Sequence, residues 1–458
     1  MLQLYNSRTR QKEVFTPLRD DYVGVYTCGP TVYNYAHVGN LRTYVFEDTL
    51  RRVLAYNGYN VRHVMNITDV GHLTDDADTG EDKMEKGSRR EGKSAADIDA
   101  FYTAAFMKNL TELEILPPHI WCKATDHIPE QINQVKTLID RGFTYETDDG
   151  IYFDTTRCPD YGQMAQLKKQ SLRAGTRVAI GDKKNPHDFA LWKFSRPEDK
   201  RQMEWAAFGK KGFPGWHIEC SAMSMKYLGE QFDIHCGGVD HIPVHHTNEI
   251  AQAEGLTTKR PWVLYWLHGE HLLLTKSKMA KSGDNFITLE KLGERGIPPL
   301  AFRYWLLQAH YRQQLTFSWA ALEAAQSGLA HLYNIIRDWT DPPRIGCAEY
   351  EAKFLAAIND DLNTPEALTV MWNLVKSDYP AHAKMASLKK FDLALGLNLT
   401  QKPSNQVVPI DVQKLLATRE LARTDRRWSE SDRLRDEIKQ LGFTIEDTAK
   451  GQRLIKDS

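Results

Sequence analysis

Residues 21–40, DYVGVYTCGPTVYNYAHVGN, decide the fold that this sequence predicts. The apolar run that ends at Cys28 is typical of a buried strand, and the Gly-Pro pair after it predicts a turn. Residues 41–56 then have the apolar spacing of a helix, and residues 59–70 return to a strand pattern. The predicted βαβ unit has its first turn at the carboxyl end of a strand, where doubly wound α/β folds bind nucleotides.

The tetrapeptide HVGN, His37 to Asn40, stands at the predicted start of that helix. A helix N-terminus offers backbone N–H groups and a partial positive charge, which favour a phosphate. His37 and Asn40 can both donate hydrogen bonds to a phosphate and stabilise charge that builds up during nucleotidyl transfer. Four residues alone also fit an ordinary turn-to-helix junction, but their place after a strand favours ATP binding.

The KMAKS segment, residues 278–282, lies in a polar loop rich in lysine. Alone it fits a solvated surface turn equally well. Lys278 and Lys281 are three residues apart and can close over a triphosphate, where their charge would act on the transition state. Together with HVGN, the segment predicts an adenylate-forming enzyme.

Cys28, Cys220, His245 and Glu249 are residue types that suit Zn²⁺. His245 and Glu249 are four residues apart and share one face of a helix, whereas His246 is expected to point about a quarter-turn away. Cys28 follows the first strand, so a metal here would join both halves of the sheet and contact substrate. Other candidate ligands remain open: His217, His235, Cys236, His241 and His246.

The sequence GGVD, Gly237 to Asp240, follows the strand-like stretch QFDIH. Glycine lets the backbone approach a ligand closely, and Asp240 can accept a hydrogen bond from a hydroxyl or an amine. By itself the motif predicts only a turn.

The chain has 458 residues, with 59 Lys and Arg against 60 Asp and Glu. A nucleic-acid contact would therefore have to come from local basic patches. The six cysteines are scattered without a CxxC pair, which favours a reducing compartment and a metal role over disulfides. We find neither an apolar leader nor a run as long as a membrane span, so the sequence predicts a cytoplasmic protein with no membrane partner.

The predicted fold class is α/β: a Rossmann-like doubly wound parallel sheet with an inserted α+β module and a C-terminal all-α region. From Ile297 onward the apolar spacing is helical and indicates no strand. The predicted parts are 1–115 and 206–275 for the two halves of the Rossmann catalytic domain, 116–205 for an inserted connective module, 276–315 for the KMAKS-loop region, 316–400 for a helical bundle and 401–458 for a C-terminal region.

Several further motifs accompany HVGN and KMAKS: CGPTVY, NITD at Asn66, DFALWK at Asp188, PGWHIECSAM at Pro214 and HHTNE at His245. On these motifs the chain resembles the class I cysteinyl-tRNA synthetases over nearly its whole length, with HVGN in place of the HIGH signature. The resemblance implies one zinc ion per chain, held by Cys28, Cys220, His245 and Glu249. It implies that ATP, with Mg²⁺, contacts His37, Asn40, Gly237, Asp240, Lys278 and Lys281. It also implies that Thr31, Thr68, Trp216 and Asp240 line the amino-acid and adenosine pocket.

The implied reaction has two steps. L-cysteine attacks the α-phosphate of ATP to form cysteinyl-adenylate and pyrophosphate, and the terminal adenosine of the tRNA for cysteine then takes the cysteinyl group. Zinc would bind the substrate as a thiolate, which serine cannot match, so no editing domain is expected. The chain is expected to act as a monomer.

The C-terminal region resembles the family's anticodon-binding region, and we expect its basic side chains to contact tRNA phosphates. These are Lys414, Arg419, Arg423, Arg426, Arg427, Arg433 and Arg435. Three positions depart from the usual family residues: Ala280 replaces a serine, Cys236 a glycine, and Leu454 an aromatic that stacks on the anticodon.

Two other functions compete with this interpretation. An ATP-dependent ligase that joins cysteine to an amino-sugar has the same catalytic half but lacks a full tRNA-binding C-terminus, and residues 316–458 argue against it. A non-catalytic RNA-binding paralogue should have lost HVGN, KMAKS or the metal quartet, and all three are present.

Overall fold

The computed structural model describes most of the chain: residues 1–70, 82–167, 183–196, 201–274, 277–278, 286–339, 345–399, 410–448 and 451–456. Lys281 lies outside the described residues, and only the backbone of Lys278 is described. The chain forms two compact units, residues 1–398 and 399–458, and each is considered by itself. None of the described helices combines the length and apolar character that a membrane span requires.

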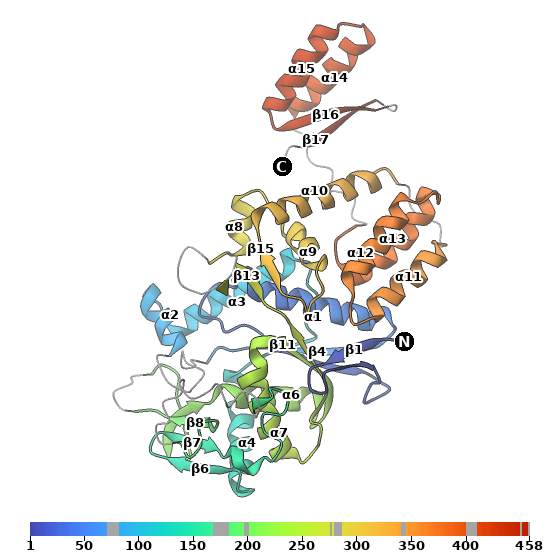
Figure 1. Cartoon of the computed structure of the whole chain (residues 1–458). Coiled ribbons are helices and arrows are strands. Elements are labelled where there is room, and N and C mark those ends of the chain that lie inside the picture. The colour runs from blue at the N-terminus through green and yellow to red at the C-terminus, as the bar shows by residue number, and fades with distance from the viewer. Residues whose placement is uncertain are drawn as a thin grey trace. The chain divides into compact units, whose positions relative to one another are not determined.

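A five-stranded parallel sheet forms the centre of the first unit (Figure 1). Its order is β12-β11-β3-β4-β5, and every neighbouring pair is parallel. The chain order reverses between β3 and β11, which makes their carboxyl ends a topological switch point. The strands are β3 Val23–Thr27, β4 Val61–Ile67, β5 Ile120–Lys123, β11 Phe232–Gly238 and β12 Val263–Gly269. This arrangement confirms the predicted α/β fold class.

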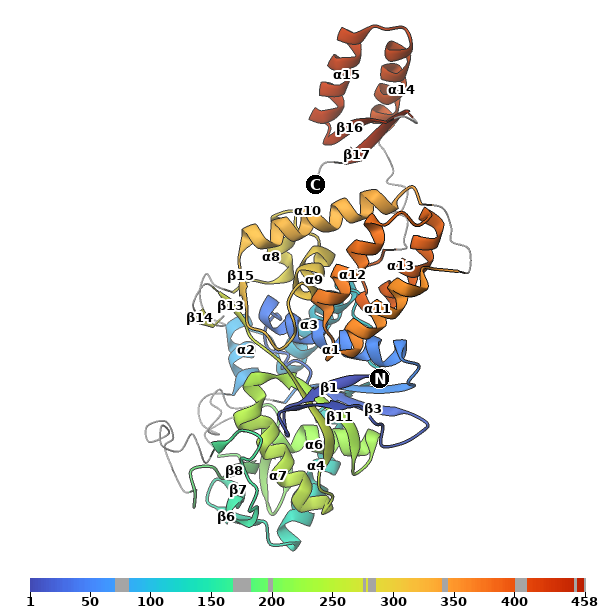
Figure 2. The same cartoon turned by 45° about the vertical axis from the view of Figure 1, so that its right-hand side comes forward.

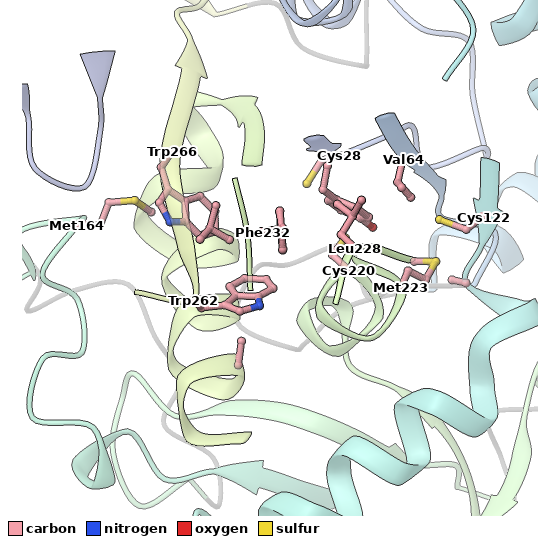
Figure 3. Close-up of a cluster of buried hydrophobic side chains, with 14 of the residues drawn as sticks. Cys28, Val64, Cys122, Met164, Cys220, Met223, Leu228, Phe232, Trp262 and Trp266 are labelled. Carbon is pink, nitrogen blue, oxygen red and sulfur yellow. The ribbon is translucent and has the colours of Figure 1, made fainter. Parts of the chain in front are cut away.

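Helices cover both faces of this sheet (Figure 2). On one side α1, Val38–Tyr56, packs on β4, β11 and β12, and on the other side α6, Trp216–Leu228, packs on β3 and β4. The core on the α6 side contains Phe232, Trp262 and Trp266, and both Cys28 and Cys220 belong to the same buried cluster (Figure 3). The remaining helices around the sheet are α2 Lys83–Glu91, α3 Ala95–Glu112, α4 Ile128–Asp140 and α7 Thr247–Thr257.

A second, antiparallel sheet forms the inserted module, in the order β6-β7-β8-β10-β9. Its limits differ from the predicted 116–205, because β5 pairs with β4 of the parallel sheet and because β9 and β10 extend the module to Pro214. The strands are β6 Thr144–Thr147, β7 Gly150–Phe153, β8 Phe189–Phe194, β9 Trp205–Ala207 and β10 Lys210–Pro214.

Two smaller sheets complete the first unit. Strand β13, Leu272–Leu274, runs parallel to β15, Leu315–Phe317, and antiparallel to β14, Ser277–Lys278. The N-terminal hairpin consists of β1, Gln3–Asn6, and β2, Gln11–Val14. Strand β15 corrects the expectation that no strand follows Ile297: three residues are too few for an alternation to be recognised.

Helices dominate the rest of the chain, as predicted. They are α8 Leu289–Glu294, α9 Pro299–Leu307, α10 Trp319–Ile336, α11 Ala348–Asn359, α12 Thr364–Lys376 and α13 Ala381–Leu395 in the first unit, and α14 Ile410–Thr424 and α15 Trp428–Gln440 in the second. The second unit also contains a hairpin of β16, Phe443–Thr448, and β17, Gly451–Lys456, so the finer expectation of an all-α C-terminus is wrong. The signal was present in Phe443 and Ile445, which alternate with polar residues and are buried.

Candidate active site

A cavity of about 340 Å³ opens at the carboxyl ends of β3, β4 and β11, at the switch point. We call it the central cavity. Nine of the predicted site residues line it: Cys28, Thr31, His37, Asn40, Thr68, Trp216, Cys220, Asp240 and His245. Glu249 is fully buried behind its wall, and Gly238 lines it in place of Gly237. Lys83, Thr43, Glu270 and His271 also line it, and no motif in the sequence pointed to them.

The HVGN residues form the cap of α1. His37 Nδ1 accepts a hydrogen bond from the Asn40 backbone N–H at 3.1 Å, and Asn40 Oδ1 accepts from the His37 N–H at 3.3 Å. Because Nδ1 is an acceptor, a neutral His37 ring carries its proton on Nε2, which is the donor that a phosphate oxygen needs. A Cβ atom at Gly39 would lie 3.0 Å from the His37 ring, so the glycine leaves room for this ring position.

The turn after β3 is held by the NITD segment. The Asn66 side chain accepts from the Gly29 N–H at 2.9 Å and donates to Thr68 Oγ1 at 3.0 Å. A Cβ atom at Gly29 would be only 1.6 Å from the Asn66 carbonyl oxygen, so no other residue fits there without backbone movement. Thr31 and Thr68 then meet as an isolated parallel bridge, which places both predicted substrate residues on the cavity wall.

The GGVD turn brings the end of β11 close to two histidines. A Cβ atom at Gly237 would lie 2.6 Å from His241 Nδ1 and 2.8 Å from a ring carbon of His246. A Cβ atom at Gly238 would lie 2.4 Å from the Asp240 carboxylate. Both glycines are therefore required by close approach, and they let Asp240 reach the cavity.

A buried cluster of metal-ligand types lies under the cavity. One ligand atom each from Cys28, His245, His246 and Glu249 lies within 4.8 Å of the others. The Cys28 sulfur is 3.5 Å from His246 Nε2, and the Glu249 carboxylate is 3.5 Å from His245 Nε2 and 3.8 Å from His246 Nε2. Cys220 is outside this tightest group, but it belongs to the same buried cluster as Cys28 and lines the cavity.

The position of His246 differs from the expectation that it points away. Residues Ile242–His246 form a π-helical turn before α7, so the regular helical spacing does not apply to them. The His246 ring is held from behind, because its Nδ1 is 2.7 Å from His268 Nε2 and His268 Nδ1 is 2.8 Å from Ser7 Oγ. This chain of contacts turns His246 Nε2 toward Cys28.

The charges in the cluster fit a cation. Burial raises the pKa of Glu249 well above its ordinary value, and its Oε2 accepts no hydrogen bond from any described residue, although His235 Nε2 is 3.2 Å away. Burial lowers the pKa of His235 to about 3 and that of His246 well below its ordinary value, so both rings are neutral. A buried carboxylate among neutral imidazoles and thiols is costly unless a positive ion balances it. The donor set of sulfur, nitrogen and oxygen suits zinc.

Comparison with known proteins gives the family. The catalytic-domain model of class I (C) tRNA synthetases matches residues 14–327, the DALR domain matches 353–377, and the anticodon binding domain of cysteinyl-tRNA ligases matches 406–454. Cysteine–tRNA ligase 1 of Burkholderia lata is 53% identical over 456 residues, which cover 99% of this chain and 97% of that protein. The chain belongs to the cysteinyl-tRNA synthetase family.

Other relatives agree with this family over the same length. Cysteine–tRNA ligase of Treponema denticola is 45% identical over 98% of each chain. Among solved structures, a methionyl-tRNA synthetase of Mycobacterium tuberculosis with methionyl-adenylate has a TM-score of 0.55 at 14% identity, and covers 82% of this chain and 89% of that one. At this identity the likeness concerns the class I fold alone.

In the C-terminal unit, one of the basic side chains that were expected to contact tRNA phosphates is not accessible. Arg419 is fully buried and forms two hydrogen bonds with Asp447, at 2.9 and 3.0 Å, so it cannot meet a phosphate. Arg423 and Arg435 also bind Asp447, but both are partly exposed. Only the exposed basic side chains remain candidates for tRNA contact.

Proposed function

We propose that this chain is a cysteine–tRNA ligase that activates L-cysteine with ATP and transfers it to the tRNA for cysteine. The observation that supports this most is the central cavity, where the capped N-terminus of α1 and the buried metal-ligand cluster lie at one switch point. A phosphate-binding helix end beside a thiol-reading metal is what cysteine activation requires.

We propose the following roles for the residues of the central cavity. His37 Nε2 and the N-terminus of α1 bind ATP phosphates, and Gly238 and Asp240 of the GGVD turn contact the nucleotide. Thr31, Thr68 and Trp216 hold the cysteine, with the Trp216 ring stacked on His245 at 4.4 Å. Lys278 and Lys281 supply positive charge to the phosphates, with Mg²⁺. The carboxylate of cysteine attacks the α-phosphate of ATP and displaces pyrophosphate, so no side-chain nucleophile is needed, and binding geometry and electrostatics supply the catalysis.

We propose that Cys28, Cys220, His245 and Glu249 hold one zinc ion. His246 is the alternative to Cys220 as the fourth ligand. Zinc would supply a Lewis acid that binds the substrate thiol as thiolate and leaves serine unselected. Metal analysis of the pure protein should give about one equivalent. Cys220→Ser should lose most of it while His246→Gln keeps it. The reverse result would exchange Cys220 for His246 in the ligand set.

The deciding experiment is ATP/pyrophosphate exchange with each of the twenty amino acids, followed by charging of tRNA. Cysteine alone should support rapid exchange, serine should support far less, and chelation should abolish the cysteine signal. Cysteine-dependent exchange without tRNA charging, but with capture by an amino-sugar, would favour the small-molecule ligase. The match of residues 406–454 to an anticodon-binding domain argues against that ligase.

The compartment and the oligomeric state are part of the same proposal. All six cysteines are buried free thiols, which favours a reducing, cytoplasmic location. The monomeric state expected from the sequence remains a prediction that sedimentation equilibrium would check.

A further inference from the structure

Arg42 connects α1 to the opposite wall of the central cavity. It lies one turn after the HVGN cap and is only 5% exposed. Its guanidinium donates to the backbone carbonyls of His271 and Gln313, and more weakly to that of His310 at 3.5 Å. All three acceptors are backbone carbonyls of residues far from Arg42 in the sequence. Arg42 therefore holds the backbone of these distant segments in place.

The acceptors of Arg42 stand at the starts of two paired strands. His271 precedes β13 and Gln313 lies two residues before β15, and these strands run parallel with Leu272 opposite Leu315. The two segments are also joined directly, because the Leu315 N–H donates to the His271 carbonyl at 3.3 Å. Arg42 therefore holds the β13–β15 pair at the end that faces α1.

The segment held by Arg42 is a wall of the cavity. Residues 269–272 line it, and so do His37, Gly39, Asn40 and Thr43 of the α1 start. The spacing is close, since a Cβ atom at Gly269 would lie 3.2 Å from the Phe46 ring of α1. A change in the Arg42 contacts would alter the width of the cavity beside the HVGN cap, whereas Cys28, Cys220 and His245 lie on other elements.

The chemistry of the contact is specific to arginine. A guanidinium fork can donate to several carbonyls at once in a fixed plane, which a single ammonium group cannot do. Burial lowers the pKa of Arg42 to about 10, with Glu270 acting in the opposite direction, so the side chain remains charged at neutral pH.

We propose that Arg42 is a positioning residue that fixes the 269–272 wall against the HVGN helix and so sets the affinity for ATP, but not for cysteine. The inference depends on the proposed function, since ATP is taken to bind at the HVGN cap. Arg42 touches neither substrate, and it acts through the backbone of His271 and Gln313.

The test uses the full-length, metal-loaded protein and cysteine-dependent ATP/pyrophosphate exchange. Arg42→Met should raise the KM for ATP about tenfold or more, because hydrogen bonds of a charged donor are lost. The KM for cysteine should stay within about twofold, a change too small to report a lost contact. The KM for ATP of Arg42→Lys should lie between those of Arg42→Met and the wild type, because lysine keeps one charged donor. This variant also guards against a folding defect, for which the methionine variant is at greater risk.

Arg51→Met is the matched control. Arg51 lies on the same helix and donates to the carbonyls of Leu116 and Pro117, which do not line the cavity. Its KM for ATP should equal that of the wild type. An ATP KM in both Arg42 variants equal to that of the control, or an equal rise for ATP and cysteine, would overturn the positioning role. Absence of exchange in the wild type would instead reject the proposed function.

Discussion

At single positions in the cavity wall, the neighbouring side chains limit which residue type can fit. Gly39 is the clearest case, because it stands inside α1 and yet a Cβ atom there would press on the His37 ring at 3.0 Å. In a helix, alanine is ordinarily more stable than glycine by roughly 1 kcal/mol. Retaining glycine here therefore gives up helix stability to keep the ring in place.

Gly39→Ala should separate stability from activity. We expect its melting temperature to equal or exceed that of the wild type, because the helix gains an alanine. Its exchange rate should fall about tenfold, the effect of a displaced contact of roughly 1.4 kcal/mol in the transition state. Thermal unfolding and exchange kinetics on the same preparation would measure both. Full activity in a stabilised Gly39→Ala protein would mean that the His37 position is unimportant.

The buried His63 predicts a dependence of stability on pH. Burial, with help from the Arg51 and His119 charges, lowers its pKa to about 3, and its Nε2 lies 2.9 Å from Thr27 Oγ1. An unfolded histidine has a pKa of about 6.5, so below that pH the unfolded chain binds a proton that the folded chain does not. The stability is therefore fully present above about pH 6.5 and is lost progressively toward pH 3.

His63→Gln should remove this dependence while keeping a hydrogen-bonding group toward Thr27. Between pH 8 and pH 5 the wild type should lose roughly 2 kcal/mol more unfolding free energy than the variant, which is about 1.4 kcal/mol for each pH unit below 6.5. Urea unfolding at the two pH values measures the difference. Parallel losses in both proteins would show that His63 is protonated in the folded state.

At the scale of elements, one carboxylate links the hairpin of the C-terminal unit to both of its helices. Asp447 on β16 binds Arg419 of α14 at 2.9 Å, and it also pairs with Arg423 of α14 and Arg435 of α15. The Arg419 guanidinium is fully buried, and the Asp447 carboxylate supplies the opposite charge beside it. The hairpin is thereby fastened to both helices.

Asp447→Asn should loosen this unit. The loss should be roughly 2 kcal/mol, below that of a fully buried pair because the Asp447 carboxylate is partly exposed. Hydrogen exchange in residues 410–440 of the full chain should rise accordingly. Arg433→Ala is the control, because Arg433 is exposed and pairs only with Glu437 on its own helix among the described contacts. Equal exchange in the two variants would contradict a structural role for Asp447.

Elements were predicted from the sequence where local pattern and tertiary contacts agree. The βαβ unit before residue 70 has strong apolar periodicity, and the HVGN residues cap their own helix, so both could be read locally. The direction of the His246 side chain could not be predicted locally, because it depends on a π-helical turn and on His268 of strand β12. The contacts of Arg42 could not be predicted from the sequence, because its acceptors lie more than two hundred residues away. Strand β15 has only three residues, too few for an alternation to be recognised, whereas the alternation of Phe443 and Ile445 with polar residues does indicate strand β16.

At the scale of the whole molecule, the order of strands explains where chemistry can occur. Reversal between β3 and β11 leaves their carboxyl ends open, and segments separated by two hundred residues supply Cys28 and the GGVD turn there. Every described cavity residue belongs to residues 1–398, while the anticodon-binding match begins at residue 406. Under the proposed function, activation of cysteine belongs to the first compact unit and binding of the anticodon to the second.

Truncation after residue 400 should separate the two steps. The first unit keeps the whole described cavity, so cysteine-dependent ATP/pyrophosphate exchange should stay within about twofold of the wild type, a barrier change below 0.5 kcal/mol. Cysteinyl-tRNA formation should fall at least tenfold, mainly through a higher KM for tRNA, because the exposed basic side chains of α14 and α15 are removed. The charging reaction of the full chain should also weaken with added salt, and that of the truncated chain should weaken less, since fewer phosphate contacts remain. Charging as efficient as that of the full chain would show that the C-terminal unit does not contribute to tRNA binding, and the amino-sugar ligase would again need to be considered.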